Sequence, residues 1–214
     1  LHYPLRRQRQ MCIRDRHYDR PAEYFEEALV IGNGTMGATL YGGVKKDKIS
    51  FNDITLWTGE PESENSSPDA FNVIPEIRAL LDNEDYEGAD KAQYKVQGHY
   101  SENYQPLGTL TIEYLDDTAG ISDYHRWLDI GNATARTQYL KDGKLFTSDY
   151  FASAPDSVIV IRLKSENKEG IHALLSFDSP LPYSSQVADN EISVEGYAAY
   201  HSLSLIHISE PTRP

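Results

Sequence analysis

The chain has 214 residues, of which 39% are hydrophobic, 11% aromatic and 25% charged. These proportions are typical of globular chains and exclude collagen-like, coiled-coil and wholly disordered proteins. No apolar run approaches the roughly 18 residues that a membrane-spanning helix needs, so we expect no membrane partner. Its 20 basic and 33 acidic residues give a net charge of −13, which disfavours nucleic acid but leaves neutral sugars admissible. One cysteine, Cys12, excludes an internal disulfide and any cysteine-based metal centre.

The two ends differ in character from the rest of the chain. Residues 1–20 contain six arginines, without helical or strand periodicity and without the apolar region of a signal peptide. Met11–Arg16 (MCIRDR) and Ser202–Pro214 resemble translated sequencing-adapter sequence. We therefore expect residues 1–20 and 202–214 to be non-native or disordered, with the folded domain at residues 21–201. The cellular location stays open, since the native N-terminus is not visible.

The first predicted element is the apolar run Ala28–Ile31, which leads into the glycine-rich segment Gly32–Gly37. Its glycines have the GxGxxG spacing of dinucleotide-binding proteins, in which a helix must follow to hold the pyrophosphate. Here Ala38–Val44 (ATLYGGV) follows, and its composition disfavours a helix. The pattern instead predicts a glycine-permitted turn into a strand, with Gly42-Gly43 at a bulge or a close backbone approach.

One segment, Val73–Val96, has helical spacing of its apolar residues, and Pro75 fits a first helical turn. The polar residues Asp82–Asp85 divide it, so two short helices are predicted. Acidic side chains gather around this break: Asp82, Glu84, Asp85, Glu87 and Asp90. They suit a solvated helix start, which the helix dipole favours. A calcium site is the alternative, although the ligand spacing of an EF-hand loop is absent.

Strand signals dominate the remainder of the chain. Thr109–Leu115 alternates apolar and polar residues, while Ala133–Leu140 and Lys144–Ser153 flank Asp142-Gly143, a dipeptide that favours tight hairpins. Val158–Leu163 is apolar on both faces apart from Arg162, which predicts a central strand covered on both sides. Two shorter strands are expected at Ile171–Phe177 and Glu191–Val194. Repeated strands with turns between them predict an all-β antiparallel sandwich with a small helical insert.

Sequence motifs for catalysis are absent. The histidines lack the i, i+4 spacing of a helical metal pair, and no GxSxG nucleophile elbow occurs. Carboxylates are too numerous for a glycosidase pair to be chosen, because that pair is defined by its separation in space. We expect no metal and no cofactor.

Two turn-rich loops combine aromatic and amide side chains. Asn52–Gly59 contains Trp57, and His99–Gly108 contains Gln105. A flat aromatic ring stacks on the C–H face of a sugar, and an amide both donates to and accepts from hydroxyl groups. These loops therefore favour sugar contacts. The alternative for Trp57 is a position in the hydrophobic core.

Eight collinear blocks within about residues 22 to 180 resemble glycoside hydrolase family 95, the bacterial α-L-fucosidases. They are Leu29–Ala38, Tyr41–Val44, Asn52–Gly59, Pro75–Leu81, Tyr104–Gly108, Tyr124–Ile130, Ala133–Ala135 and Phe151–Val160. Ile54 and Thr35-Met36 depart from residues that are common in the family.

The resemblance implies an incomplete N-terminal super-sandwich domain that packs against a following α/α barrel. The family hydrolyses terminal α1,2-linked L-fucose from glycans with inversion, and its catalytic groups lie on the barrel, so no catalytic residue is assigned here. Members are often secreted or periplasmic. We hypothesise that Trp57, Gln105, Asn52 and His99 contact the fucosylated oligosaccharide. The alternatives are a freestanding carbohydrate-binding sandwich and a purely structural domain.

Overall fold

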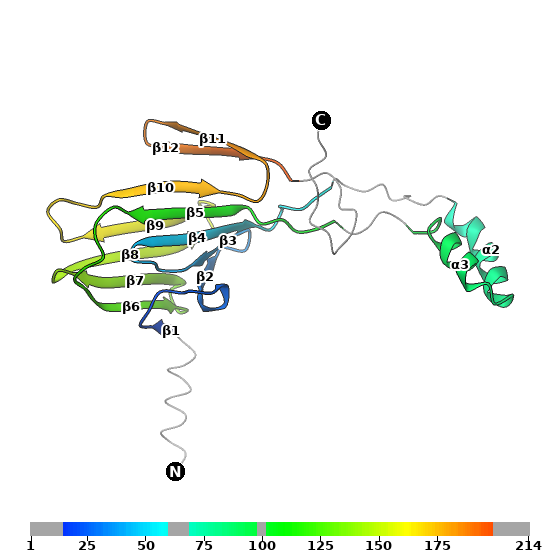
Figure 1. Cartoon of the computed structure of the whole chain (residues 1–214), viewed down its shortest axis with the longest axis horizontal. Coiled ribbons are helices and arrows are strands. Elements are labelled where there is room, and N and C mark those ends of the chain that lie inside the picture. Colours follow the sequence, from blue (N-terminus) through cyan, green and yellow to red (C-terminus); the bar gives the residue numbers. More distant parts are fainter. Residues whose placement is uncertain (1–14, 60–68, 98–101, 199–214) are drawn as a thin grey trace, which may run out of the picture. The chain divides into compact units, whose positions relative to one another are not determined.

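The computed structural model describes residues 15–59, 69–97 and 102–198, and these divide into two compact units (Figure 1). The first unit contains the described residues up to Leu56 and from Gln105 to Tyr197. The second contains the described residues between Trp57 and Tyr104, together with Ala198. In the described part of the chain, no helix is long and apolar enough to cross a membrane. Of the terminal segments predicted to be non-native or disordered, 1–20 and 202–214, residues 1–14 and 202–214 lie outside the described residues.

The first unit consists of two five-stranded sheets and a hairpin, and every strand pair is antiparallel. One sheet has the order β1-β6-β7-β8-β9, formed by Asp15–Tyr18, Ile121–Asp129, Thr134–Lys141, Lys144–Ser153 and Val158–Ser165. The other has the order β10-β5-β4-β3-β2, formed by Ala173–Asp178, Gly108–Tyr114, Lys46–Asp53, Met36–Leu40 and Leu29–Gly32. The hairpin consists of β11 and β12, Tyr183–Ala188 and Glu191–Gly196. The predicted antiparallel sandwich is confirmed.

The inward faces of both sheets form one hydrophobic core. Its buried members alternate along the strands with outward-facing side chains, as expected for sheets covered on one face. They are Leu29, Ile31, Ala38, Leu40, Ile49, Ile112, Tyr114, Ala135, Tyr139, Phe146 and Tyr150. Polar bonds also join the sheets. The hydroxyl of Tyr150 on β8 donates to a carboxylate oxygen of Asp47 on β4 at 2.7 Å.

The glycine-rich segment forms a turn between two strands, as predicted. β2 ends at Gly32 and β3 begins at Met36. The carboxamide oxygen of Asn33 accepts the backbone N–H of Thr35 at 3.0 Å and that of Met36 at 2.8 Å, which closes the turn. Because a strand follows, the geometry for holding a pyrophosphate is missing. The close approach predicted at Gly42-Gly43 is also confirmed, since a Cβ on Gly43 would collide with the carbonyl oxygen of Lys46.

The prediction of a central strand at Val158–Leu163 is wrong. Among the described residues, β9 is the last strand of its sheet and pairs only with β8. Ile159 and Ile161 pack against the core, whereas Val158 on the opposite face is exposed. The apolar residues on the second face therefore form surface, not a second buried layer.

The N-terminal described segment is attached to the first sheet. β1 pairs with β6, so residues 15–18 form an edge strand. Arg126 on β6 is buried, and its guanidinium donates to the carbonyl oxygens of Arg20 and Glu27, both at 2.8 Å. Its guanidinium carbon also lies 4.0 Å from the centre of the Tyr18 ring. Glu27 ends a short 3-10 helix, η1, at Phe25–Glu27.

The second unit contains the two predicted helices, α2 at Ala70–Asp82 and α3 at Tyr86–Gln93. Asp85 caps α3, because its carboxylate accepts the backbone N–H of Gly88 at 2.9 Å. The acidic residues at the break thus begin a helix, as predicted. Among the described residues, no group of three or more histidine, cysteine, aspartate or glutamate side chains is placed to hold a metal ion.

Candidate sugar-binding residues and cavities

Asn52 lies near the end of β4, opposite Gly37 of β3. The inward residues of this strand are Asp47, Ile49 and Phe51, so alternation places Asn52 on the outer face of the sheet. The side chain is half-buried, and its carboxamide oxygen accepts the backbone N–H of Asp53 at 3.2 Å.

Gln105 begins the segment that leads into β5. Its backbone N–H donates to the carbonyl oxygen of Leu56 at 2.9 Å, which fixes the main chain of two loops within the first unit. The residue is half-buried. Asn52 and Gln105 therefore belong to the same unit, Asn52 to strand β4 and Gln105 to the segment that leads into β5.

Trp57 belongs to the second unit, where it forms an isolated antiparallel bridge with Tyr104. The two rings meet edge to face, with centroids 5.7 Å apart at 72°. The hydroxyl of Thr58 donates to Glu102 and accepts the backbone N–H of Asn103 at 2.8 Å, which tightens the loop pair. Trp57 is 50% exposed, which contradicts its alternative reading as a core residue. His99, the fourth predicted contact, lies outside the described residues.

An apolar cavity of about 240 Å³ opens beside the segment that follows Gln105. Leu107 and Leu56 contribute to one wall, and the region of the β11–β12 hairpin contributes two tyrosines, Tyr183 and Tyr197. Tyr183 meets Phe177 edge to face at 6.0 Å, and its hydroxyl donates to the carbonyl oxygen of Phe177 at 3.1 Å. These tyrosines were not predicted from the sequence, although aromatic residues on both sides of a short hairpin are a signal that could have indicated them.

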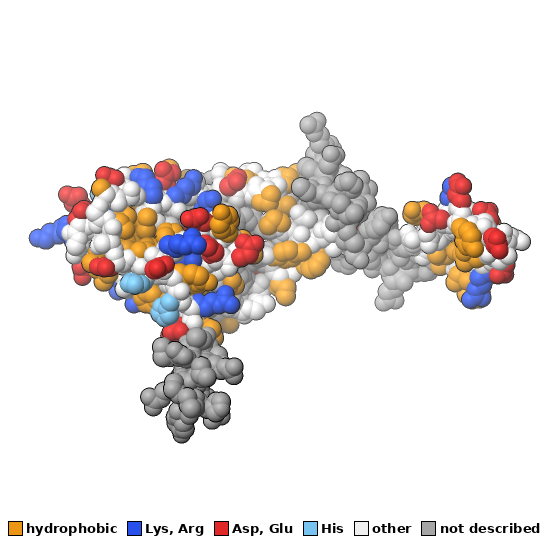
Figure 2. All heavy atoms as spheres, turned by 60° about the horizontal axis from the view of Figure 1, so that its bottom comes forward, with side chains coloured by type: hydrophobic (Ala, Val, Ile, Leu, Met, Phe, Trp, Pro, Cys, Tyr) orange, Lys and Arg blue, Asp and Glu red, His pale blue; other side chains and the backbone are white. Residues whose placement is uncertain are grey.

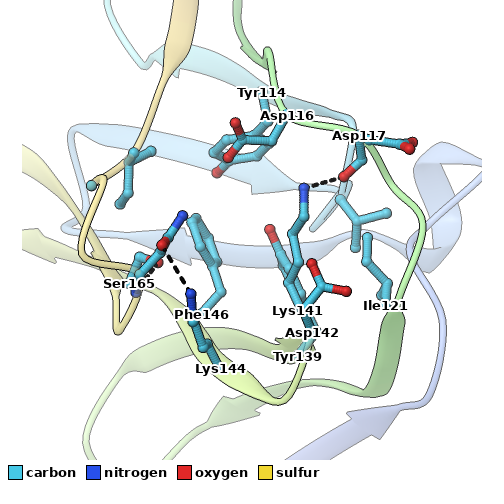
Figure 3. Close-up of a pocket in the computed structure, with 14 residues that line it drawn as sticks. Tyr114, Asp116, Asp117, Ile121, Tyr139, Lys141, Asp142, Lys144, Phe146 and Ser165 are labelled. Atoms are coloured by element: carbon cyan, nitrogen blue, oxygen red, sulfur yellow. Dashed lines mark hydrogen bonds between the residues drawn. The ribbon is translucent and has the colours of Figure 1, made fainter.

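A second cavity, of about 60 Å³, lies at the opposite end of β5 (Figure 3). Its floor is aromatic: Phe146 stacks on Tyr139 at 4.8 Å and meets Tyr114 edge to face at 5.2 Å. Its rim is charged, with the ammonium group of Lys141 donating to the backbone oxygen of Asp117. This volume accommodates water molecules better than a sugar ring.

The carboxyl of Asp47 has a raised pKa, but it cannot reach a substrate. Burial raises the pKa of Asp47 to about 6, against hydrogen bonds from Tyr150 and from the backbone. Its side chain is 1% exposed and lies between the sheets. At the rim of the second cavity, backbone N–H groups hold the pKa of Asp117 below its usual range. A general acid for glycoside cleavage needs both a raised pKa and access to the leaving oxygen. Asp47 has the first of these properties without the second.

The fold thus defines a β-sandwich domain with a helical insert, and the segments around Trp57 and Gln105 carry aromatic and amide side chains. The family model described as "Glycosyl hydrolase family 65, N-terminal domain" matches residues 17–209. The chain belongs to this family of glycoside hydrolase N-terminal domains. The resemblance to a glycoside hydrolase family is thus confirmed at the level of an N-terminal domain.

Curated relatives agree with this assignment. "Alpha-L-fucosidase 2" of Arabidopsis thaliana is 32% identical over 180 residues, covering 82% of this chain and 21% of the relative. "Probable alpha-fucosidase A" of Aspergillus niger is 30% identical over 160 residues, covering 70% of this chain and 20% of the relative. The protein of the same name from Aspergillus oryzae is 27% identical over 145 residues, covering 65% and 20%. These relatives are plant and fungal, so they do not show the bacterial origin that the resemblance implied. The chain spans about a fifth of their length.

Proposed function

We propose that this chain is the non-catalytic N-terminal domain of an α-L-fucosidase that removes terminal α1,2-linked L-fucose from glycans with inversion. The observation that carries the proposal is the match to three α-fucosidase relatives over 65% to 82% of the chain. In this proposal, the acid and the water-activating groups lie on an α/α barrel in the rest of the polypeptide. The sandwich supports that barrel and contributes to the rim of the sugar pocket.

The site chemistry supports a division of labour between the sandwich and the barrel. An inverting glycosidase needs two carboxyl groups about 6.5 to 9.5 Å apart, one of them protonated near neutral pH. Asp47 has a raised pKa, and it is buried in the core. The exposed carboxylates with a resolved shift, such as Asp53 and Asp129, have their pKa lowered by hydrogen bonds from neighbouring groups. They serve as hydrogen-bond acceptors and not as acids.

The test compares the 214-residue chain with the complete gene product on 2′-fucosyllactose. We expect fucose release by the complete protein only, with the β-anomer appearing first in proton NMR spectra, as inversion requires. Fucose release by the chain alone would refute the assignment as a non-catalytic domain. A complete protein that is inactive on fucosides but active on other glycosides would refute the proposed substrate.

We propose further that Trp57, Gln105, Asn52 and His99 contact the sugar. Support comes from the half-exposed indole of Trp57 and from the outward position of Asn52 on β4. In the complete enzyme, Trp57→Ala is expected to raise KM or lower kcat at least about ten-fold, with an unchanged Tm. Trp57→Phe, which keeps an aromatic ring, should restore part of the loss. A lower Tm with unchanged kinetics would show that Trp57 has a structural role only.

A further inference from the structure

A straight row of five side chains crosses the outer face of the first sheet. In the strand register, His17 is opposite Trp127, Trp127 opposite Arg136, Arg136 opposite Asp149, and Asp149 opposite Arg162. Neighbouring residues of these strands point into the core, so the row faces outward. Directly opposed cross-strand pairs are the closest side-chain neighbours in a sheet, and here each pair interacts.

The contacts along this row hold its polar groups in fixed positions. The rings of His17 and Trp127 stack with centroids 6.1 Å apart, and the guanidinium of Arg136 lies 5.7 Å from the centre of the Trp127 ring. Asp149 accepts hydrogen bonds from Arg136 and, at 2.8 Å, from Arg162. Partial burial opposes ionisation of Asp149, yet these hydrogen bonds and charges hold its pKa below the usual range. The carboxylate is therefore ionised at neutral pH.

A hollow of about 420 Å³ lies between this row and the next one on the same face. The second row contributes Asp129, Thr134, Phe151 and Val160, which are again opposite one another on successive strands. The ring of Phe151 is exposed. Figure 2 shows the surface of this unit, on which hydrophobic side chains lie directly beside basic and acidic ones.

The charges that line the hollow cancel. Arg136 and Arg162 are balanced by Asp129 and Asp149, in a chain whose net charge is −13. A neutral lining gives no attraction for a phosphate polymer or for an acidic peptide, whereas paired donors and acceptors match hydroxyl groups. The aromatic rings of Trp127 and Phe151 offer apolar surface for the C–H face of a sugar ring.

We propose that this hollow, on the outer face of β6, β7, β8 and β9, binds a neutral oligosaccharide. The ring of one sugar residue lies against Phe151 and Trp127, which both line the hollow. The carboxylate of Asp149 accepts a hydrogen bond from a sugar hydroxyl group, and the guanidinium of Arg162 donates a hydrogen bond to a hydroxyl oxygen. This hollow lies on the first sheet, whereas Asn52, one of the proposed sugar contacts, lies on β4 of the second sheet, so a site here extends the proposed function.

The test is calorimetric titration of the 214-residue chain with three probes: lactose, 2′-fucosyllactose and 3′-sialyllactose. We expect saturable binding of at least one neutral probe, no tighter binding of the sialylated one, and weakening by about ten-fold or more in Trp127→Ala and in Arg162→Gln. The side chain of Arg162 is more than half exposed, so Arg162→Gln is expected to fold. This variant therefore tests the site even if Trp127→Ala destabilises the domain. Phe25→Ala, which removes an exposed ring outside the hollow, is the matched control and should bind as the parent chain does.

Three outcomes would overturn the proposal. One is the absence of saturable binding with both neutral probes. Another is binding that Trp127→Ala and Arg162→Gln leave unchanged while Trp57→Ala abolishes it, which would assign the sugar to the loop residues and support the proposed function alone. The third is a change in sedimentation of Trp127→Ala without a change in sugar affinity, which would identify the face as a protein contact.

Discussion

The sandwich and the helical pair differ in how much apolar surface they bury. In the sandwich, two sheets enclose a continuous core, and Ile49 at its centre is 0% exposed. In the helices, the buried residues are Ala89 and Ala92, both on α3. α2 has no buried residue, and its Phe71 is 82% exposed.

This difference indicates where each region gains its stability. Burial of large apolar side chains contributes about 1.5 to 3 kcal/mol per residue, and the sandwich has many of them. Helices of 13 and 8 residues are marginal on their own, so the helical pair relies more on caps and ion pairs. Substitutions of equal size should therefore have unequal effects in the two regions.

The largest effect is expected for Ile49→Ala. Loss of a fully buried isoleucine leaves a cavity between the sheets, and such substitutions cost about 2 to 5 kcal/mol of unfolding free energy. Ile74→Ala in α2 is the matched control, because Ile74 is partly exposed and alanine favours helix. Urea unfolding should show a loss below about 1 kcal/mol for the control. Equal losses in both variants would remove the distinction between the regions.

The next effect concerns Asp47, the buried carboxyl of the sandwich. Burial raises its pKa from an ordinary 3.8 to about 6, against the hydrogen bonds from Tyr150 and Gly43. The folded state therefore binds the proton more tightly than the unfolded state does. This contribution to stability is fully present below about pH 4 and is lost as the pH rises through about 6. It amounts to at most about 3 kcal/mol, from roughly two pKa units.

Asp47→Asn isolates this dependence, because the amide is neutral and its oxygen still accepts from the Tyr150 hydroxyl. Urea unfolding at pH 4, 5, 6 and 7 should show the chain losing stability relative to the variant across this range. The difference between the two proteins is the relevant quantity, since Asp149 and Asp129 have lowered pKa values with the opposite slope. A difference that is constant with pH would show that Asp47 stays ionised in the fold.

The sequence predicts the regular parts of both regions and misses strands that bury a charge. β8 was predicted with its observed bounds, Lys144–Ser153, because alternation and a tight turn define it. β4 and β6 were not predicted as strands. In β4 a charged residue, Asp47, is buried beside Ile49, and in β6 the buried residue is Arg126, so the apolar alternation that marks an inward face is interrupted. Their partners, Tyr150 and the carbonyl of Arg20, are distant in sequence and appear only in the fold.

The candidate sites also divide into residues that the sequence predicts and residues that are brought together only by the fold. Trp57 and Gln105 could be predicted from the sequence, because each lies in a single short segment that combines aromatic and amide residues. The row from His17 to Arg162 was not visible, because its members come from five strands and are aligned only by register. Strand register depends on hairpin turns and on a bulge between Ser122 and His125, which periodicity does not locate.

A smaller effect is expected at the start of α3. Asp85 accepts the backbone N–H of Gly88, and loss of such a cap costs about 1 kcal/mol. Asp69→Ala is the matched control, since Asp69 occupies the same position before α2 without a capping hydrogen bond from its side chain. Hydrogen exchange of α3 amides should accelerate in Asp85→Ala, with little change in the sandwich. Equal acceleration of helix exchange by Asp69→Ala would show that the helix dipole, and not the cap, is the source.

The smallest effect concerns the ion pair between Glu87 and Lys91 on α3, whose charged atoms are 2.6 Å apart. Both side chains are largely exposed, and an i, i+4 pair of this kind contributes about 0.3 to 0.5 kcal/mol. Lys91→Gln removes the charge and keeps a similar helix propensity, so the pair alone is tested. Exchange of α3 amides should rise slightly at low salt and match the parent chain at 1 M salt, where the Debye length falls to about 3 Å. A loss that persists at high salt would mean that Lys91 stabilises the helix through packing of its aliphatic stem, and the helical pair would then depend on burial more than its exposed surface suggests.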